Sequence, residues 1–139
     1  MTGFLLDTNV VSELRKRERA SARVLAWFQA HRTEEFWLSV LVVGELRRGV
    51  ELVARRDHAT ASALRAWLDS TVHDYADRIL PVTLTISERW ATLSVPDPIP
   101  VIDGLLAATA IEHHLTLVTR NLTDVQSTGA DLVNPLDPI

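Results

Sequence analysis

Three acidic residues stand where the surrounding sequence predicts a side chain that points inward. Asp7 ends the short apolar run 4–6, which predicts a strand whose carboxyl end opens at a sheet edge, where α/β proteins bind ligands. Glu45 and Asp103 lie among apolar neighbours in helical patterns. Carboxylates that meet at one edge repel one another, and Mg²⁺ or Mn²⁺ would relieve that repulsion. The three residues therefore predict a divalent metal site.

The helix expected around Glu45 has one apolar side, and Glu45 lies on it. At about 100° per residue, Glu45 falls between Leu41 and Gly49, on the side away from Arg47. An ionised carboxylate in that arc is costly unless it is paired or bound to a cation. Gly49 leaves room for another group to approach. A glutamate that reaches solvent at the rim, or that pairs with an arginine, is the alternative interpretation.

Asp103 opens a helix expected over 102–114 and shares a face with Ala107 and Ala110. These small side chains favour close packing of that helix on the sheet, so Asp103 is expected to point inward. Each acid also has an ordinary explanation. The helix dipole favours an acid in the first turn, which would account for Asp103, and an aspartate after a strand often starts a turn, which would account for Asp7.

A fourth polar position follows the apolar run 115–119, which predicts a strand buried on both faces. If that strand is parallel to the first, its carboxyl end lies on the same rim as Asp7. Asn121 is the nearer candidate and Asp124 is the nearest charged one. An Asx-type turn explains Asn121 equally well.

Several other chemistries lack the residues that they need. An aspartyl-phosphate enzyme with an Asp-x-Asp strand end would need an acid where Asn9 stands, and a phospho-receiver domain would need a lysine where Arg120 stands. The adjacent His113 and His114 project about 100° apart on a helix, so they do not form a metal pair. Glycine-rich phosphate-binding patterns and a nucleophile elbow are absent from the sequence.

Length and composition predict one α/β domain over residues 1–139 in a reducing, cytoplasmic compartment. The chain is 47% hydrophobic and contains no cysteine, which excludes disulfides and thiolate metal sites. The apolar run at its start is too short for a signal peptide, and no apolar stretch approaches the length of a membrane span. We expect strands over 4–7, 36–39, 79–82, 115–119 and 131–133, and helices over 10–17, 22–31, 40–55, 59–75, 86–93 and 102–114. Strands separated by helices indicate a mainly parallel central sheet flanked by helices.

The charged residues argue against indiscriminate nucleic-acid binding, because the net charge is −4. Lys16 is the only lysine among fourteen basic residues, and arginine is the side chain best suited to phosphate. Candidates for contacts to phosphate groups around the acidic site are Arg15, Arg47, Arg48 and Arg120. We expect the four tryptophans to anchor the core or a dimer interface rather than to stack on bases.

Four stretches of the sequence together resemble the PIN-domain proteins, and more narrowly the VapC toxins and their FitB-like relatives. The stretches are LLDTNVVSELR at 5–15, VGELRRG at 43–49, DGLLAATA at 103–110 and LTLVTRN at 115–121, followed by Asp124. The resemblance runs essentially end to end. It departs from the family pattern at Asn121, where many relatives carry Asp, at Val125, where Phe is frequent, and at Gly104, where Ala is common. The change at Asn121 leaves the number of metal ions open.

This resemblance implies a three-layer PIN-like fold and a Mg²⁺- or Mn²⁺-dependent endoribonuclease that is the toxin of a type II toxin–antitoxin pair. Asp7 and Asp103 would be the principal metal ligands, Glu45 would complete the cluster directly or through water, and Thr8 would support Asp7 by hydrogen bonding. Glu45 or Asp124 would act as general base on single-stranded or loop RNA.

The implied partners are a second copy of the chain and a VapB-like antitoxin, through which the complex would bind operator DNA. The antitoxin tail would cover the acidic groove. Two other functions compete with this one. One is a non-catalytic regulator that binds a partner or operator DNA, and the other is a DNA nuclease, because no residue identifies a contact to a ribose 2′-hydroxyl.

Overall fold

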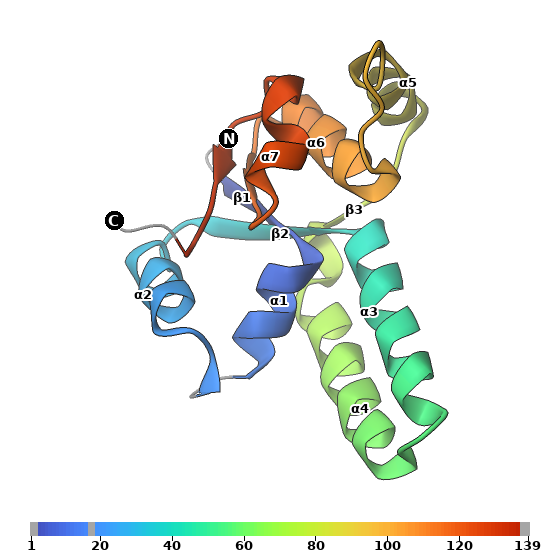
Figure 1. The fold of residues 1–139 in the computed structure, drawn as a ribbon. Helices are drawn as coiled ribbons and strands as arrows, with labels where there is room; N and C mark the ends of the chain where they lie inside the picture. Colours follow the sequence, from blue (N-terminus) through green and yellow to red (C-terminus); the bar gives the residue numbers. More distant parts are fainter. Residues whose placement is uncertain (1–2, 17–18, 137–139) are drawn as a thin grey trace.

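A five-stranded sheet with all strands parallel forms the centre of the molecule (Figure 1). The computed structural model describes residues 3–16 and 19–136. The strand order is β3-β2-β1-β4-β5. The strands are β1 (Gly3–Leu6), β2 (Glu35–Ser39), β3 (Ile79–Leu80), β4 (Thr116–Val118) and β5 (Leu132–Val133). The expected parallel sheet is confirmed.

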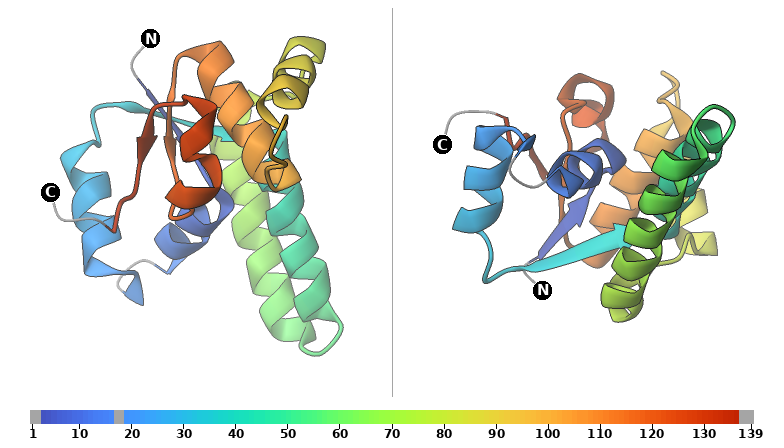
Figure 2. Two further views of the ribbon diagram at one scale, coloured as in Figure 1. Left: turned by 45° about the horizontal axis from the view of Figure 1, so that its top comes forward. Right: turned by 90° about the horizontal axis from the view of Figure 1, so that it is seen from below.

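Helices cover both faces of the sheet. The helices are α1 (Thr8–Arg15), α2 (Ala22–Ala30), α3 (Val40–Ala54), α4 (His58–Asp74), α5 (Leu84–Leu93), α6 (Val101–His113) and α7 (Leu122–Val125). Short 3-10 turns follow at Ala76–Arg78 and Gln126–Thr128. Figure 1 shows α5, α6 and α7 on one side of the sheet and α1, α2 and α4 on the other. Together with Figure 2 it also shows that α3 and α4 form a hairpin that projects beyond the sheet.

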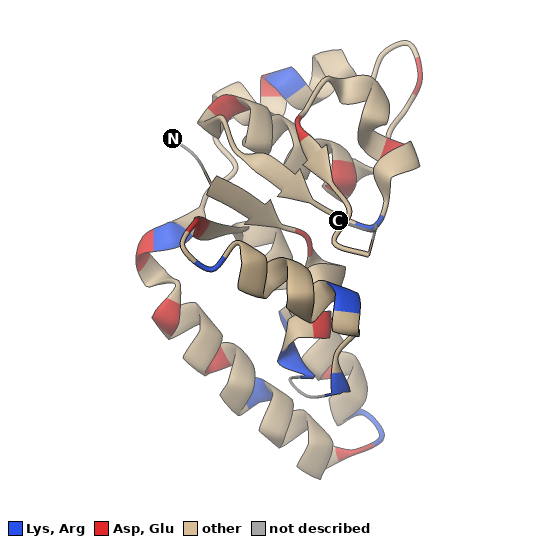
Figure 3. Cartoon of the chain, turned by 90° about the vertical axis from the view of Figure 1, so that its left-hand side faces the viewer, with Lys and Arg blue, Asp and Glu red and all other residues tan. Residues whose placement is uncertain are grey.

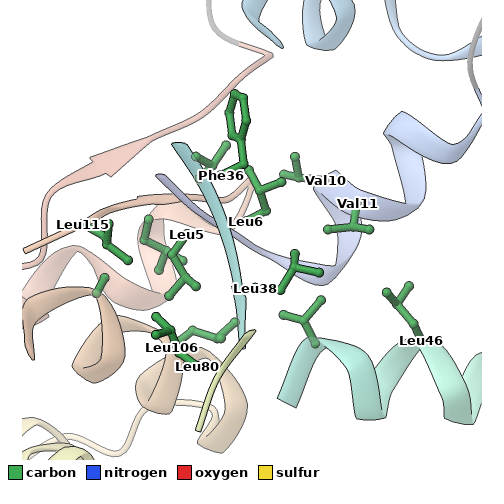
Figure 4. Close-up of a cluster of buried hydrophobic side chains, with 14 of the residues drawn as sticks. Leu5, Leu6, Val10, Val11, Phe36, Leu38, Leu46, Leu80, Leu106 and Leu115 are labelled. Carbon is green, nitrogen blue, oxygen red and sulfur yellow. The ribbon is translucent and has the colours of Figure 1, made fainter. Parts of the chain in front are cut away.

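The core lies on both faces of the sheet, around the central strand β1 and its neighbour β4 (Figure 4). Consecutive residues Leu5 and Leu6 of β1, and Leu117 and Val118 of β4, are all buried, although they point to opposite faces. A strand that is covered on both sides loses the apolar–polar alternation, which is why these runs are continuous. Trp27 is a core anchor, as expected, and meets Phe4 edge to face at a centroid distance of 5.0 Å.

The element boundaries differ from the expected ones in ways that have physical causes. Helix α1 begins at Thr8 and is capped by Asp7, the residue after β1, so it starts two residues before the expected position 10. Its expected end at residue 17 lies outside the described residues. Strand β3 ends at Leu80, because Pro81 has no N–H to continue the ladder. Helix α7 is too short to produce a periodic pattern, and the sequence did not predict it.

None of the described helices is both long and apolar enough to cross a bilayer.

Candidate active site

The carboxyl ends of β1 and β4 open into a cavity of about 440 Å³. Six polar residues line it: Asp7, Thr8, Asn9, Glu45, Asp103 and Asn121. They come from the ends of two strands and from the first halves of α1, α3 and α6. The sheet topology therefore brings Asp7, Glu45 and Asp103 together, as the sequence predicted.

Asp7 is buried and held in place on both sides of its carboxylate. Its Oδ1 accepts a hydrogen bond from the Thr8 N–H at 2.7 Å, and its Oδ2 accepts one from the Thr119 hydroxyl at 2.7 Å. Burial raises the pKa of the Asp7 carboxyl, the hydrogen bonds from Thr119 and Thr8 oppose that effect, and the charge of Glu45 adds to it. The net pKa lies above its ordinary value, so an ionised Asp7 would gain from a nearby cation.

Thr8 supports two acids through two different groups. Its N–H bonds to Asp7, whereas its hydroxyl donates to Glu45 Oε1 at 2.5 Å. The structure thus shows the expected hydrogen bond from Thr8 to Asp7, and it is made by the backbone amide. Thr8 is the first residue of α1, so its amide faces the capping carboxylate while its side chain reaches across to α3.

Asp103 lies in the first turn of α6 and has the most perturbed carboxyl of the site. Burial raises the pKa of Asp103 to about 6, with further contributions from the charges of Asp7, Asp124 and Glu45. The carboxylates therefore interact electrostatically, although they come from separate elements. A pKa raised by burial and like charges is typical of functional carboxyl clusters.

The fourth position is occupied by Asn121 and not by Asp124. Asn121 lines the cavity, and its N–H donates to the Thr119 hydroxyl at 3.1 Å. Its side chain makes no capping hydrogen bond to α7, so the Asx-turn explanation is not observed. Asp124 is exposed on α7 and reaches the site only through its charge. The structure therefore does not bring Asp124 to the cavity as a direct participant.

Thr119 is the site residue that the sequence reasoning missed. It is buried directly after β4, and its hydroxyl links Asp7 to the backbone of Asn121. Thr119 could have been found by the criterion that identified Asp7, because both are polar residues that directly follow an apolar strand. Thr119 went unnoticed because threonine is common in strands and carries no charge.

The arginines expected around the site are displaced from it. Arg47 pairs with Asp69 at 2.8 Å, and the guanidinium of Arg15 lies 5.9 Å from the Trp67 ring. Arg48 and Arg120 are exposed, and the cavity lining includes none of the four. Contacts of these arginines to a substrate stay a prediction, and helix partners engage two of the four, Arg15 and Arg47.

Gly104 provides space for a tryptophan beside Asp103. A Cβ placed on Gly104 would lie 2.9 Å from Cδ1 and 3.1 Å from Nε1 of Trp90, closer than packed atoms tolerate. The departure from the common alanine is therefore explained by the ring of Trp90, which occupies the volume of that methyl group.

The donor atoms of the cavity suit a hard divalent cation. The polar side chains of the lining are three carboxylates, the Thr8 hydroxyl and the amides of Asn9 and Asn121, and each offers an oxygen, which is the ligand atom that Mg²⁺ and Mn²⁺ prefer. Among the described residues, no three acidic or histidine side chains are placed so that they could hold one ion together. A cation at this cavity would therefore need water molecules among its ligands, as Mg²⁺ commonly has.

Comparison with known proteins assigns the family. The family model of the PIN domain matches residues 4–123, which include Asp7, Glu45, Asp103 and Asn121. The chain belongs to the PIN-domain family. This PIN domain is 36% identical to VapC ribonuclease Y4jK from Sinorhizobium fredii, over 97% of the chain and 99% of the relative.

Solved structures support the same assignment. The crystal structure of FitAcB from Neisseria gonorrhoeae has a TM-score of 0.84 and 33% identity to this PIN domain, over 95% of this chain and 97% of the other. The structure of FitAB bound to the IR36 DNA fragment has a TM-score of 0.85 and 30% identity, over 98% and 97%. The PIN-like α/β architecture and the kinship with VapC and FitB proteins are thereby established.

Proposed function

We propose that this PIN domain is a metal-dependent endoribonuclease and the toxin of a type II toxin–antitoxin pair. The observation that carries the proposal is the cavity in which Asp7, Glu45 and Asp103 meet, with the pKa of Asp7 and of Asp103 raised above the ordinary value. The kinship with a protein named VapC ribonuclease supports the choice of RNA as substrate.

The proposed cofactor is Mg²⁺ or Mn²⁺. Asp7 and Asp103 would hold the ion, and Glu45 would complete the set directly or through water. When bound, such an ion lowers the pKa of a water molecule and neutralises charge that develops on a phosphodiester. Oxygen donors and mutual carboxylate repulsion in one cavity support this choice.

The protein side chains orient the reactants and move one proton. The Thr8 hydroxyl fixes Glu45 through Oε1, which leaves Oε2 to accept the proton of the attacking water as general base. The Thr119 hydroxyl and the Thr8 amide hold Asp7 in a single orientation. The Asn121 amide, at the cavity wall, is suited to donate a hydrogen bond to a phosphate oxygen.

The proposed partners are a VapB-like antitoxin that covers the acidic cavity, and a second copy of the chain. Two related structures support the antitoxin, namely FitAcB from Neisseria gonorrhoeae and FitAB bound to the IR36 DNA fragment. Operator DNA would accordingly be bound through the antitoxin. The toxin would act in the cytoplasm on single-stranded or loop RNA, whose backbone and bases are accessible.

Cleavage of structured RNAs by the purified protein tests the proposal. We expect cleavage with Mg²⁺ or Mn²⁺, none with EDTA, and a loss of at least about 100-fold after Asp7→Asn or Asp103→Asn. Asp131→Asn is the matched control, since Asp131 is exposed at the start of β5 and lies outside the cavity lining. Equal cleavage by all of these proteins, with and without EDTA, would overturn the mechanism.

Two further measurements separate the competing functions. Calorimetry with Mn²⁺ should show binding that Asp103→Asn weakens, whereas a non-catalytic regulator would bind Mn²⁺ weakly or not at all. Single-stranded DNA of the same sequence as the cleaved RNA tests the DNA nuclease. Faster cleavage of that DNA than of the RNA would replace the proposed substrate.

A further inference from the structure

One exposed face of α3 begins at the acidic cavity and runs away from it along the helix. Arg48, Leu52 and Arg55 follow Glu45 at intervals of three, seven and ten residues, which places all four within an arc of about 80°. Arg48 and Arg55 are exposed, and Leu52 is 45% exposed although it is apolar. The first residue of this row, Glu45, lines the cavity.

The neighbouring side of α3 is occupied by contacts to α4. Arg47 pairs with Asp69 at 2.8 Å, and Glu51 pairs with Arg65 at 3.4 Å. In contrast, no ion pair to Arg48 or Arg55 occurs within the part of the chain that the structure describes. The contact with α4 therefore uses the charges on one side of α3, and Arg48 and Arg55 lie on the other side without an ion pair among the described residues. Figure 3 shows that charged residues of both signs occur along the α3–α4 hairpin.

The surface beside Glu45 is open down to the helix backbone. Gly49 lies one turn beyond Glu45 and is exposed, and a Cβ placed on it would meet no atom within 4 Å. The same holds for Gly44 on the other side of Glu45. At Gly44 and Gly49 an approaching chain can therefore come close to the backbone of α3.

We propose that the RNA strand leaves the acidic cavity along this row, here called the α3 strip and defined by Arg48, Gly49, Leu52 and Arg55. The proposal rests on the ribonuclease function proposed above and names the path of its substrate. Arg48 and Arg55 would pair with phosphates, and Leu52 would contact a base or a ribose. The strip supplies the positive charge that the acidic cavity lacks.

The length of the strip fits a short stretch of RNA. Ten residues separate Glu45 from Arg55, which is about 15 Å along a helix. About four stacked nucleotides, at about 3.4 Å each, span that distance. Arg48 therefore serves a phosphate close to the cleaved bond and Arg55 one that is several nucleotides away.

Steady-state cleavage by an Arg48→Gln, Arg55→Gln double variant tests the path. With a single-stranded RNA of a dozen nucleotides, we expect KM to rise about tenfold at unchanged kcat, as for the loss of two exposed charge contacts. The slope of log(kcat/KM) against log salt should become shallower by about 1.4, since each phosphate contact on a single strand contributes about 0.7.

The matched control is Arg32→Gln. Arg32 is exposed in the turn between α2 and β2, at the amino end of the strands and away from the cavity. It should leave KM and the salt slope as in the wild type. All variants change exposed side chains, and equal unfolding temperatures will show that the fold is intact.

Each result separates the two proposals. If the wild type cleaves no RNA, the ribonuclease function fails. If the wild type cleaves RNA and the double variant has the wild-type KM and salt slope, the path along α3 fails and the function stands. If the double variant instead weakens binding of a partner protein while RNA cleavage is unchanged, the strip is a protein-binding surface and the RNA path is wrong.

Discussion

Asp7 carries two structural roles with one carboxylate. It caps α1 through the Thr8 amide, and it lines the acidic cavity. Replacing a capping aspartate by alanine typically costs about 1 kcal/mol of stability, so Asp7→Ala would mix a folding defect with a chemical one. Asparagine retains a capping oxygen, and for this reason it is the more informative substitution at this position.

Gly104→Ala should destabilise the protein, although alanine is the better helix former. The new methyl group would lie 2.9 Å from Cδ1 of Trp90, and overpacking of this kind costs about 1–3 kcal/mol, more than the roughly 1 kcal/mol gained from helix propensity. Urea unfolding measures the difference. Trp90→Leu in the Gly104→Ala background should recover part of the loss.

Gly44→Ala is the matched control for that prediction. Gly44 is also inside a helix, but its Cβ would meet no atom within 4 Å, so the substitution should stabilise by about 0.5–1 kcal/mol. If Gly104→Ala stabilised the protein as much as Gly44→Ala does, the close fit of Trp90 would be refuted.

At the scale of residues, sequence patterns located the three acidic residues better than the residues that form hydrogen bonds with them. Asp7, Glu45 and Asp103 were placed at the cavity by periodicity and by strand ends alone. Thr119 and the double role of Thr8 depend on hydrogen bonds between distant segments, and such bonds leave no periodic trace. The partner of Arg47 could not be predicted for a related reason, because Asp69 lies on another helix.

The α3–α4 hairpin is the element that presents Glu45 to the site, and apolar packing holds it together. Leu68 of α4 is fully buried among core residues that include Leu46 and Val50 of α3. The ion pair between Arg47 and Asp69 lies on the hairpin surface, where the Asp69 side chain is 62% exposed. Packing should therefore dominate the stability of the hairpin.

Leu68→Ala should lower the free energy of unfolding by about 2–5 kcal/mol, as for a large core side chain that leaves a cavity. Asp69→Asn should change it by less than about 1 kcal/mol, since exposed ion pairs contribute little. Both values come from the same urea titration. A larger loss for Asp69→Asn than for Leu68→Ala would mean that electrostatics, and not burial, holds the hairpin.

For the molecule as a whole, the acidic site makes stability depend on pH. The pKa of Asp103 is raised from 3.8 to about 6 and that of Asp7 is also raised, so the folded state binds these protons more tightly than the unfolded state does. Their stabilising contribution is complete below about pH 4 and is lost as the pH rises through 6. The pKa values of Glu13 and Asp57 are lowered, which makes stability rise with pH. This effect is confined to pH values below about their ordinary pKa values of 4.5 and 3.8.

The metal-free protein should therefore become less stable between about pH 4.5 and pH 7. Urea unfolding in EDTA measures this slope, and Asp103→Asn should flatten it, because the variant has no proton to lose at that position. With saturating Mn²⁺ the loss of stability toward pH 7 should disappear, since the ion favours the ionised carboxylates. A stability that rises from pH 4.5 to pH 7 in EDTA would contradict this account.

The bond from the Thr8 amide to Asp7 Oδ1 also makes the site observable without any substrate. An amide proton that donates to a carboxylate resonates at a position that depends on whether the acceptor is charged. The ¹⁵N–¹H signal of Thr8 will therefore report the ionisation of Asp7 directly. It should move on titration with acid, and move again on titration with Mg²⁺ at neutral pH. One resonance thus follows proton and metal occupancy of the cavity in solution.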